Sequence, residues 1–586
     1  MDLLKTQVTP LVKKALESLG LDGALAEKML QPARESTQGD LSLPCFPFAK
    51  TLSMAPAAVA EQLEIAMPAH PSIGEVKAVN GYLNLRADLT WLTEQLLNGP
   101  PQAGFSGQRK GVLIEHTSAN PNGPFHVGRA RNAILGDTLV RLHRLWGNEV
   151  TAEYYVDDMG KQVAVLAWAL DHLPPEAVEN LLREREAVNP KWNGKADHER
   201  VRWYQAAQLL RKQSEDAEEI EEAIARLVHA SEHGDESVLE AFEQAYQPVL
   251  DGMLETLGRL GIHFDRFTKE SMFVTNGDVA RLMEELGELE INGVAENGAQ
   301  FLDLGARGLK GKTEFFYRRG DGSSLYATRD IAYHRWKWQQ SSELINVLGE
   351  DHKLQAQQVG LTLEELGEAR PEVVFYSFIK LPEGKMSTRR GNVVFMDDLL
   401  EEAKAQAAAV VGSLRPEYDE STVSNIAEAV GTSAVRFNII NVSPEKGFTF
   451  RWEDALSFES GSAPFIMYSH TRACSIRKRV MELNPTPSPP SKKAIQTTTI
   501  PEGLATLLRT LAVHNDCLGK VVREHRPHLY AEYLLHLSNA YNGFYRDCHI
   551  INDGVVDERY FAVSELAREV LRKGMEGLGI VALETM

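Results

Sequence analysis

The spacing of apolar residues along the first hundred residues predicts a small α/β unit. Residues 1–20 have the periodicity of an amphipathic helix, and residues 46–67 have a second helical pattern that is entered through a proline. Residues 75–89 alternate apolar and polar residues around Asn80-Gly81, a pair that favours a hairpin turn. The stretch 98–111 is rich in Gly, Pro and polar residues, so we interpret it as a domain boundary.

A strand, a loop and a helix follow one another from residue 112. Residues 112–116, "VLIEH", form an apolar run, and residues 149–156, "EVTAEYYV", have the pattern of a second strand. Between them, apolar residues recur at helical spacing until Gly147-Asn148 ends the helix. These helical positions are Val127, Ala130, Ile134, Leu135, Leu139, Leu142 and Leu145. The order strand, loop, helix, strand is the βαβ unit of a parallel sheet.

The rest of the chain alternates long helical stretches with short strands. Residues from about 160 to 300 are mostly helical and highly charged, which is typical of solvated helix faces. Strand patterns return at 344–348 and 373–379. From about 400 the pattern is helical almost to the end, apart from a proline-rich break at 484–501.

These patterns predict a multidomain α/β protein. Its central core would be a Rossmann-like parallel sheet with a helical insertion, flanked by a small α/β N-terminal domain and an all-α C-terminal bundle. We expect boundaries at 1–100 for the first domain, 105–400 for the core with its insertion at about 160–300, and 401–586 for the bundle.

Composition limits the class of protein further. A content of 43% hydrophobic and 25% charged residues is typical of soluble globular proteins. No apolar stretch is long enough to span a membrane, and the N-terminus lacks a signal-peptide pattern. The four scattered cysteines predict neither disulfides nor a zinc site, so we expect a cytoplasmic protein. A net charge of −20 argues against non-specific nucleic-acid binding but permits a local basic face.

The segment "ANPNGPFHVGRARNAILGD" places His126 and Arg129 at the start of the predicted helix 127–146. A helix N-terminus has free N–H groups and partial positive charge, and the preceding glycines and prolines let a ligand approach the backbone. The segment therefore predicts a polyphosphate site. The alternative is an ordinary helix start, with His126 as a cap and Arg129 in solvent.

A second segment, "LPEGKMSTRRGNVV", carries a cluster of cations after the predicted strand 373–379. Lys385, Arg389 and Arg390 lie there beside the hydroxyls of Ser387 and Thr388. Cations on a loop at the carboxyl end of a sheet strand suit a phosphate clamp, and a solvated basic turn is the alternative.

Taken together, the two segments resemble the signature motifs of class I aminoacyl-tRNA synthetases. "HVGR" is similar to the HIGH motif and "KMSTR" to the KMSKS motif, in the expected order. "IEHTSANPNGPFHVGRARNAILGD", "YYVDDMGKQ", "LYATRDIAYH" and "VLGEDH" resemble the arginyl-tRNA synthetase family. "GDLSLPCFPFAK" and "VNGYLNLRADL" resemble its tRNA-contacting first domain, and "MYSHTRACSIRKR" resembles the start of its anticodon-binding domain.

The resemblance implies roles for residues around the two motifs. Arg129 stands where HIGH has its last histidine, and Thr388 stands where KMSKS has a lysine. Some family members without that lysine have one just before the first motif, where this chain has Gly123. The implied catalytic residues are His126, Arg129, Lys385, Ser387 and Arg389. The implied ATP-binding residues are Pro124, His126, Gly128, Arg129, Lys385, Met386 and Ser387.

The resemblance also implies an arginine pocket. The family pattern assigns Glu115, Asn120, His126, Tyr326 and Asp330, with Glu350 as a further candidate. A guanidinium offers five donors in a planar fork, so a pocket for it needs carboxylates at fixed geometry. The spacing of Tyr326 and Asp330 places both on one helix face. Without the resemblance, Glu115 would be an acid at a strand end and Asp330 a helix cap.

Cations and aromatic residues in the C-terminal helices are candidates for tRNA binding, because unpaired bases stack on aromatic faces. We expect Arg472, Tyr541, Tyr545 and Arg546 to contact tRNA, with Tyr541 and Tyr545 on one helix face. The alternative is that these aromatic residues belong to the core of the bundle.

The implied reaction joins L-arginine to the 3′ end of tRNA(Arg) through arginyl-adenylate, with ATP as substrate and Mg²⁺ held mainly by ATP. The resemblance further implies that arginine activation requires tRNA, and that the enzyme is monomeric and has no membrane partner. Two alternatives stay open: a synthetase-like protein that binds tRNA without catalysis, and another class I synthetase such as the cysteinyl enzyme, which would use zinc.

Overall fold

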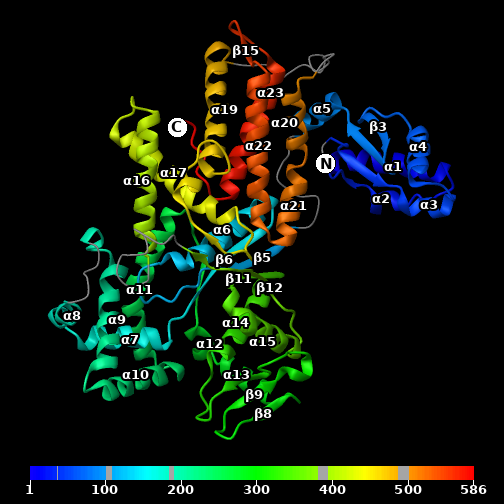
Figure 1. Ribbon diagram of the computed structural model, residues 1–586. Helices are drawn as coiled ribbons and strands as arrows, with labels where there is room; N and C mark the ends of the chain where they lie inside the picture. The colour runs from blue at the N-terminus through cyan, green and yellow to red at the C-terminus, as the bar shows by residue number, and fades with distance from the viewer. Residues whose placement is uncertain (36, 100–108, 184–189, 381–393, 486–499) are drawn as a thin grey trace.

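A five-stranded parallel sheet forms the centre of the protein. The computed structural model describes residues 1–586 except 36, 100–108, 184–189, 381–393 and 486–499 (Figure 1). The strand order is β12-β11-β5-β6-β7, and every neighbouring pair is parallel. The strands are β5 (Gly111–Glu115), β6 (Glu149–Val156), β7 (Arg266–Lys269), β11 (Glu343–Gly349) and β12 (Glu372–Tyr376). The predicted parallel core is confirmed.

Helix α6 (Val127–Trp146) crosses from β5 to β6 and packs unusually close to the sheet. It begins after His126 in extended conformation and ends at Gly147, whose φ of 103° lies in the left-handed region. Gly136 faces the strand end so closely that a Cβ there would overlap the His116 side chain. A glycine at this point therefore permits close helix–sheet packing.

Two long-range contacts of α6 join it to later parts of the chain. Arg436 of α17 (Glu420–Ile440) and Asp137 of α6 form a buried ion pair at 2.6 Å. Arg131 donates to the carbonyls of Ser377 (2.5 Å), Lys446 (2.8 Å) and Ser443 (2.8 Å). These contacts fix the helix between the sheet and the C-terminal helices.

The N-terminal domain is a four-stranded antiparallel sheet, in the order β1-β2-β4-β3, with helices packed on it. Its elements are α1 (Asp2–Ser18), α2 (Leu25–Met29), β1 (Gln31–Pro32), β2 (Leu41–Pro44), α3 (Phe46–Leu52), α4 (Pro56–Ala66), β3 (Ile73–Val79), β4 (Tyr82–Ala87) and α5 (Leu89–Asn98). The single helix predicted over 46–67 is wrong: Ser53, at a φ of 51°, ends α3 before Pro56 starts α4. The domain lies beside α20 (Glu502–Ala512) and α21 (His514–Glu524), and Arg509 of α20 pairs with Asp40 at 3.1 Å (Figure 1).

The predicted helical insertion is shorter than expected. Its helices are α7 (Lys161–His172), α8 (Pro175–Leu182), η1 (Pro190–Trp192), α9 (Ala196–Gln213), α10 (Ala217–Glu232) and α11 (Glu236–Arg259). The chain then returns to the central sheet as β7, a strand that was not predicted and that interrupts an otherwise mostly helical stretch. Only four residues of β7 pair with β6, too few for a clear alternating pattern.

A second lobe lies between β7 and β11. It contains α12 (Ser271–Thr275), α13 (Asp278–Gly287), η2 (Leu304–Arg307), α14 (Tyr326–Gln340) and the antiparallel strands β8 (Asn292–Val294), β9 (Gln300–Asp303) and β10 (Glu314–Arg318). After β11 come η3 (Glu350–His352) and α15 (Lys353–Glu365). The strand predicted over 373–379 ends at Tyr376 because Ser377 donates its N–H to Pro444 and leaves the sheet.

The C-terminal part is a helical bundle, as predicted. Its helices are α16 (Met396–Leu414), α17 (Glu420–Ile440), α18 (Trp452–Ala455), α19 (Ala463–Leu483), α20 (Glu502–Ala512), α21 (His514–Glu524), α22 (Pro527–Asp547) and α23 (Glu558–Gly577). Short strand pairs accompany them: β13 (Ile379–Lys380) with β14 (Phe448–Thr449), and β15 (Ile551–Asn552) with β16 (Val555–Val556). Most of the predicted breaks at 98–111 and 484–501 lie outside the described residues. No helix in the described ranges is long and apolar enough to cross a membrane.

Candidate active site

The candidate residues gather at the carboxyl edge of the central sheet. The chain leaves β5 toward β6 on one side and later returns to β11 on the other, so β5 and β11 border a topological switch point. Ligands of open parallel sheets bind in the crevice at such a point. Glu115 is the last residue of β5, and Glu350 directly follows β11. The fold therefore places both acids at the edge where a substrate would bind.

The loop between β5 and α6 is held in a strained conformation. Thr117 and Ser118 have φ angles of 68° and 38°, in the left-handed region that residues other than glycine rarely adopt. Asn132 of α6 accepts the Thr117 N–H at 2.6 Å, and Tyr154 donates its hydroxyl to the Ala119 carbonyl at 2.7 Å. Such strain costs of order 1–3 kcal/mol per residue and is common at functional sites.

His126 occupies the N-cap position of α6, but its side chain makes no capping hydrogen bond. It forms an antiparallel bridge with Phe395, and the N–H of Val127 donates to the Val394 carbonyl at 2.9 Å. A carbonyl from the chain after the second motif thus accepts a hydrogen bond from one of the free N–H groups at the start of α6. Gly128 is exposed at this turn, so a ligand can reach the backbone there.

Burial controls the charge of the two first-motif residues. It lowers the pKa of His126 to about 4, and the Arg129 cation lowers it further in the same direction. His126 is therefore neutral at pH 7 and can donate a hydrogen bond without adding charge. Burial also lowers the pKa of Arg129, opposed by the nearby Tyr154 and Tyr376 hydroxyls, but a guanidinium keeps its charge at neutral pH. Arg129 therefore carries the positive charge of this motif.

A chain of contacts connects two of the three predicted arginine-binding acids, Glu115 and Asp330. Glu115 accepts from the buried Lys337 Nζ at 2.6 Å. Lys337 Nζ also lies 3.0 Å from Asn346 Oδ1 and 3.2 Å from His334 Nε2. His334 Nδ1 in turn lies 3.1 Å from Asp330 Oδ1. The structure thus brings Glu115 and Asp330 into one network although they lie far apart in the sequence.

Asp330 and Tyr326 lie on the first turns of α14, as predicted. Burial alone raises the pKa of Asp330, but His334 and Lys337 outweigh it, so the pKa lies below its usual value and Asp330 is an anion at pH 7. Tyr326 is 45% exposed. Burial of its hydroxyl end and the carboxylates around it, Asp330 first, raise the pKa of Tyr326 well above its usual value. An anion and a neutral hydroxyl are therefore available on one helix face.

The other two arginine-pocket candidates face different partners. Asn120 donates to Gln162 Oε1 at 3.1 Å, and Asn122 donates to the same oxygen at 2.7 Å. Glu350 is exposed and accepts from the Ser377 hydroxyl at 2.9 Å. Glu350 therefore points toward the end of β12 and contacts none of the Lys337 network.

Several predicted residues lie outside the described part of the chain. Lys385, Met386, Ser387, Thr388, Arg389 and Arg390 all belong to the undescribed segment 381–393. Pro124 is buried in the loop before His126, and a Cβ on Gly123 would contact Val201 of the insertion.

Lys337, His334 and Asn346 were not predicted from the sequence. One signal was available, because Asp330, His334 and Lys337 are spaced by four and three residues and so share a helix face. Their contact with Glu115 needs the packing of α14 against the sheet, which no local pattern encodes.

The predicted tRNA-binding tyrosines differ sharply in exposure. Tyr541 is 0% exposed, and its hydroxyl lies 2.9 Å from Ser564 Oγ. The prediction that Tyr541 presents a stacking surface is wrong, because this ring faces α23 inside the bundle. Tyr545 is 39% exposed, and the side chain of Arg546 is 78% exposed.

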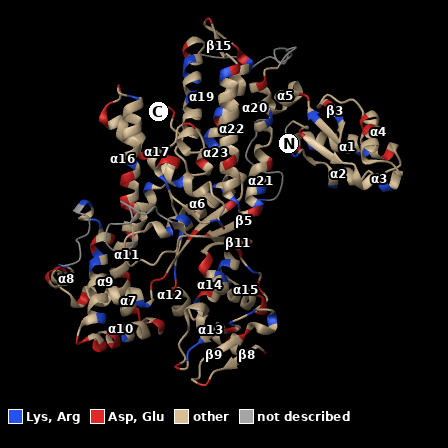
Figure 2. Cartoon of the chain, in the orientation of Figure 1, with Lys and Arg blue, Asp and Glu red and all other residues tan. Residues whose placement is uncertain are grey.

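An exposed aromatic and cationic cluster remains on α19 and α22. The Arg472 guanidinium lies 4.9 Å from the Tyr468 ring centre and 4.8 Å from that of Tyr545, and it donates to Asn542 at 2.5 Å. Figure 2 shows basic positions in blue along α19, and in the sequence Arg477, Lys478 and Arg479 follow Arg472. This local basic face contrasts with the overall charge of −20.

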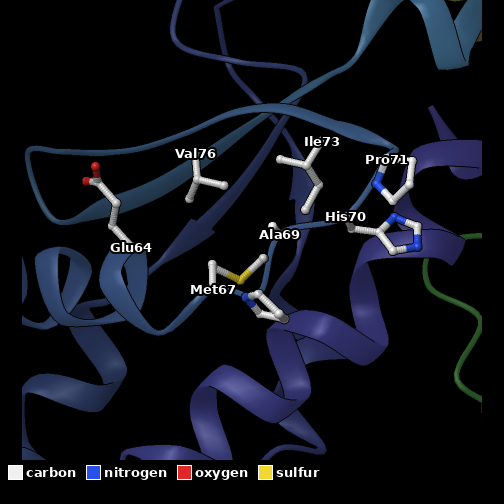
Figure 3. Close-up of a pocket in the computed structure, with 8 residues that line it drawn as sticks. Glu64, Met67, Ala69, His70, Pro71, Ile73 and Val76 are labelled. Carbon is white, nitrogen blue, oxygen red and sulfur yellow. The ribbon is translucent and has the colours of Figure 1, made fainter.

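A surface pocket in the N-terminal domain is separate from these sites. It lies between the end of α4 and strand β3 (Figure 3). Apolar side chains including Met67, Ile73 and Val76 line it, and His70 and Glu64 lie at its rim. The central sheet contributes no residue to it.

Comparison with known proteins gives matches over most of the chain. Residues 92–452 match the family "tRNA synthetases class I (R), catalytic domain", residues 6–87 match "Arginyl tRNA synthetase N terminal domain", and residues 466–586 match "DALR anticodon binding domain". The arginine--tRNA ligase of Methanocella arvoryzae is 40% identical over 94% of this chain and 95% of its own. That of Methanococcoides burtonii is 37% identical over 99% of both chains.

Solved structures show the same architecture. The arginyl-tRNA synthetase of Thermus thermophilus is 25% identical, with a TM-score of 0.79 over 99% of this chain and 100% of its own. The parallel core and the match of residues 92–452 to a class I catalytic domain define a class I aminoacyl-tRNA synthetase. Among these enzymes, the matches over the whole length are decisive: the chain belongs to the arginyl-tRNA synthetase family.

Proposed function

We propose that this chain ligates L-arginine to the 3′ end of tRNA(Arg) in two steps, with arginyl-adenylate as the intermediate. Its family membership supports the overall reaction, and relatives that are 35–40% identical over nearly the whole length are arginine--tRNA ligases. ATP enters as the second substrate, with Mg²⁺ bound mainly to its phosphates. AMP and pyrophosphate leave.

Arginine is proposed to bind at the Lys337 network. Asp330 is an anion at neutral pH, and Glu115 is bound on one side by Lys337. A guanidinium is always charged and pairs with carboxylates through two parallel hydrogen bonds. The connection of Glu115 to Asp330 through Lys337 and His334 is the single observation that carries this proposal, because it holds two acids at the sheet's switch point.

ATP is proposed to bind at the mouth of α6. Neutral His126 supplies a hydrogen-bond donor, Arg129 supplies charge, and the exposed Gly128 backbone lies between them. The carboxylate of arginine attacks the α-phosphate, and negative charge then grows on pyrophosphate. Catalysis therefore depends on holding the two substrates in line and on stabilising phosphate charge. Lys385, Ser387 and Arg389 are proposed to supply the remaining charge.

ATP–pyrophosphate exchange with each of the twenty amino acids tests the proposal. We expect exchange with arginine only, and only when tRNA is present. Exchange with lysine as well would contradict the assignment of the pocket, since lysine lacks the planar fork. Vigorous exchange without tRNA would contradict the expected tRNA requirement and leave the rest of the proposal unchanged. If tRNA binds but no amino acid supports exchange, the chain is a non-catalytic tRNA-binding protein.

A further inference from the structure

A buried lysine in the helical insertion lies at the centre of an oxygen-lined cluster. Lys195 Nζ lies 2.9 Å from Asp197 Oδ2, 2.9 Å from Asp397 Oδ2, 2.9 Å from the Gly252 carbonyl and 2.7 Å from Thr256 Oγ1. The Lys195 side chain is 9% exposed, and the two aspartates are 0% and 1% exposed. An ammonium has three donors, so these acceptors satisfy it fully.

The lysine supplies the positive charge of this acidic cluster. Asp197, His198 and Asp397 offer ligand atoms within 4.8 Å of one another, which suits a cation site. The Lys195 ammonium bonds both carboxylates, and His198 Nε2 bonds the same oxygen of Asp397 at 2.8 Å. The cluster therefore carries its own cation.

Asp397 connects this cluster to the active site. It lies on the first turn of α16, directly after residues 394–396. In that segment Phe395 forms the bridge with His126, the Val394 carbonyl accepts from Val127, and the N–H of Met396 donates to Phe125 at 2.8 Å. The same segment is thus tied to His126 on one side and to the insertion on the other.

Neighbouring contacts add to this attachment. The Trp192 indole donates to Asp398 at 3.0 Å, and its ring stacks on His198 with 5.4 Å between centres. The His198 ring packs edge-on against Phe395 at 5.2 Å. Thr256 of α11 donates to the second oxygen of Asp397 at 2.9 Å. Asp397 is therefore held through both oxygens, from α9 and from α11.

We infer that Lys195 is a positioning residue for adenylate formation, which acts through Asp397 and segment 394–396 to hold His126 at the mouth of α6. Lys195 touches neither substrate. The inference rests on the proposed function, since it assigns His126 to the ATP site. The helical insertion would then affect the reaction rate by holding His126 in place, because a small shift of a reacting group can lower a rate by about 10²-fold.

Three variants of the full-length chain test this, assayed by arginine-dependent ATP–pyrophosphate exchange with tRNA. Lys195→Met should lower kcat about 10²-fold and leave the KM for arginine within about two-fold, since Glu115 and Asp330 lie on other elements. Thr256→Val preserves volume and all charges and should lower kcat several-fold. Lys161→Met is the control, because Lys161 pairs with Glu221 on the insertion surface, and its kcat should not change.

A fourth variant separates positioning from stability. Lys195→Met with Asp397→Asn restores charge balance but not the original bonds, so melting temperature should recover while kcat stays low. Recovery of kcat together with stability would overturn the inference. A wild-type kcat in Thr256→Val would also overturn the inference. This second variant keeps the test valid if Lys195→Met does not fold. Exchange by the wild-type chain is measured in the same series. If the wild type shows no exchange, the proposed function fails, whereas a failure of the inference alone leaves wild-type exchange intact.

Discussion

Lys337 illustrates how single residues set the chemistry of the proposed pocket. It is completely buried, and the Glu115 carboxylate, Asn346 and His334 surround its ammonium. A buried charge without a partner is strongly unfavourable, so each member of this set constrains the others. Asp330, at the other end, is left with its carboxylate 20% exposed and negatively charged. The pocket therefore holds two acids in different states: Glu115 is paired with the Lys337 ammonium, and Asp330 is a partly exposed anion beside His334.

Replacing Asp330 by Asn tests that assignment. A hydrogen bond to a charged group contributes about 1.5–3 kcal/mol, so the KM for arginine should rise about 10- to 100-fold in Asp330→Asn. The KM for ATP should hardly change, because the mouth of α6 does not involve α14. Steady-state exchange kinetics measure both constants. Asp171→Asn, on an 81% exposed side chain, is the control. Equal increases in both constants would make Asp330 structural.

At the scale of elements, the close approach of α6 to β5 determines where the first motif lies. Gly136→Ala should destabilise the protein by about 1–3 kcal/mol, because the new methyl group overlaps His116. Helix propensity alone predicts the opposite result, because it favours Ala over Gly by about 1 kcal/mol. Urea unfolding measures the change. Gly412→Ala in α16 is the control, since its Cβ would meet no atom within 4 Å, and it should be neutral or stabilising.

Two tyrosines one turn apart on α22 differ in exposure: Tyr541 is buried and Tyr545 is partly exposed. Tyr541→Ala should lower the free energy of unfolding by about 3–5 kcal/mol, because it removes a fully buried ring. Tyr545→Ala should leave stability nearly unchanged and weaken tRNA binding by about 1–3 kcal/mol if that ring stacks on a base. Thermal melting and tRNA binding at matched salt distinguish them. Unchanged tRNA affinity in Tyr545→Ala and Arg546→Ala would place the anticodon site on another face.

Buried histidines make the stability of the whole molecule depend on pH. Burial lowers the pKa of His116 and of His514 from 6.5 to about 4. Below pH 6.5 the unfolded chain binds protons at these positions and the folded chain does not, so stability present above pH 6.5 is lost as pH falls toward 4. Between pH 6.5 and 4, each of these histidines lowers the free energy of unfolding by about 1.4 kcal/mol for each pH unit of acidification.

Urea unfolding of the wild type and of His514→Gln at pH 7.5, 6.0 and 5.0 checks this dependence. The wild type should lose about 1.4 kcal/mol more per pH unit than the variant below pH 6.5, because the variant lacks one of the titrating groups. Parallel curves for the two proteins would show that His514 is protonated in the folded state. In that case the protonated imidazole of His514 would donate the hydrogen bond to the Tyr530 hydroxyl, which lies 2.9 Å from Nε2.

Local patterns determined much of this protein. The strands at 112–116 and 149–156 and the start of the helix at Val127 follow from short-range periodicity and turn chemistry. The two motifs and their neighbouring segments determined the family. These features need only residues close in sequence, so the sequence by itself was sufficient.

Tertiary structure decided the features that depend on distant partners. Tyr541 and Tyr545 have the same local pattern, yet one is buried and the other is exposed, because α23 covers only part of α22. Lys337 reaches Glu115 only because α14 packs against the sheet, and Lys195 reaches Asp397 only because the insertion folds back onto α16. Burial and charge pairing are set by which elements meet, and local periodicity carries no information about that.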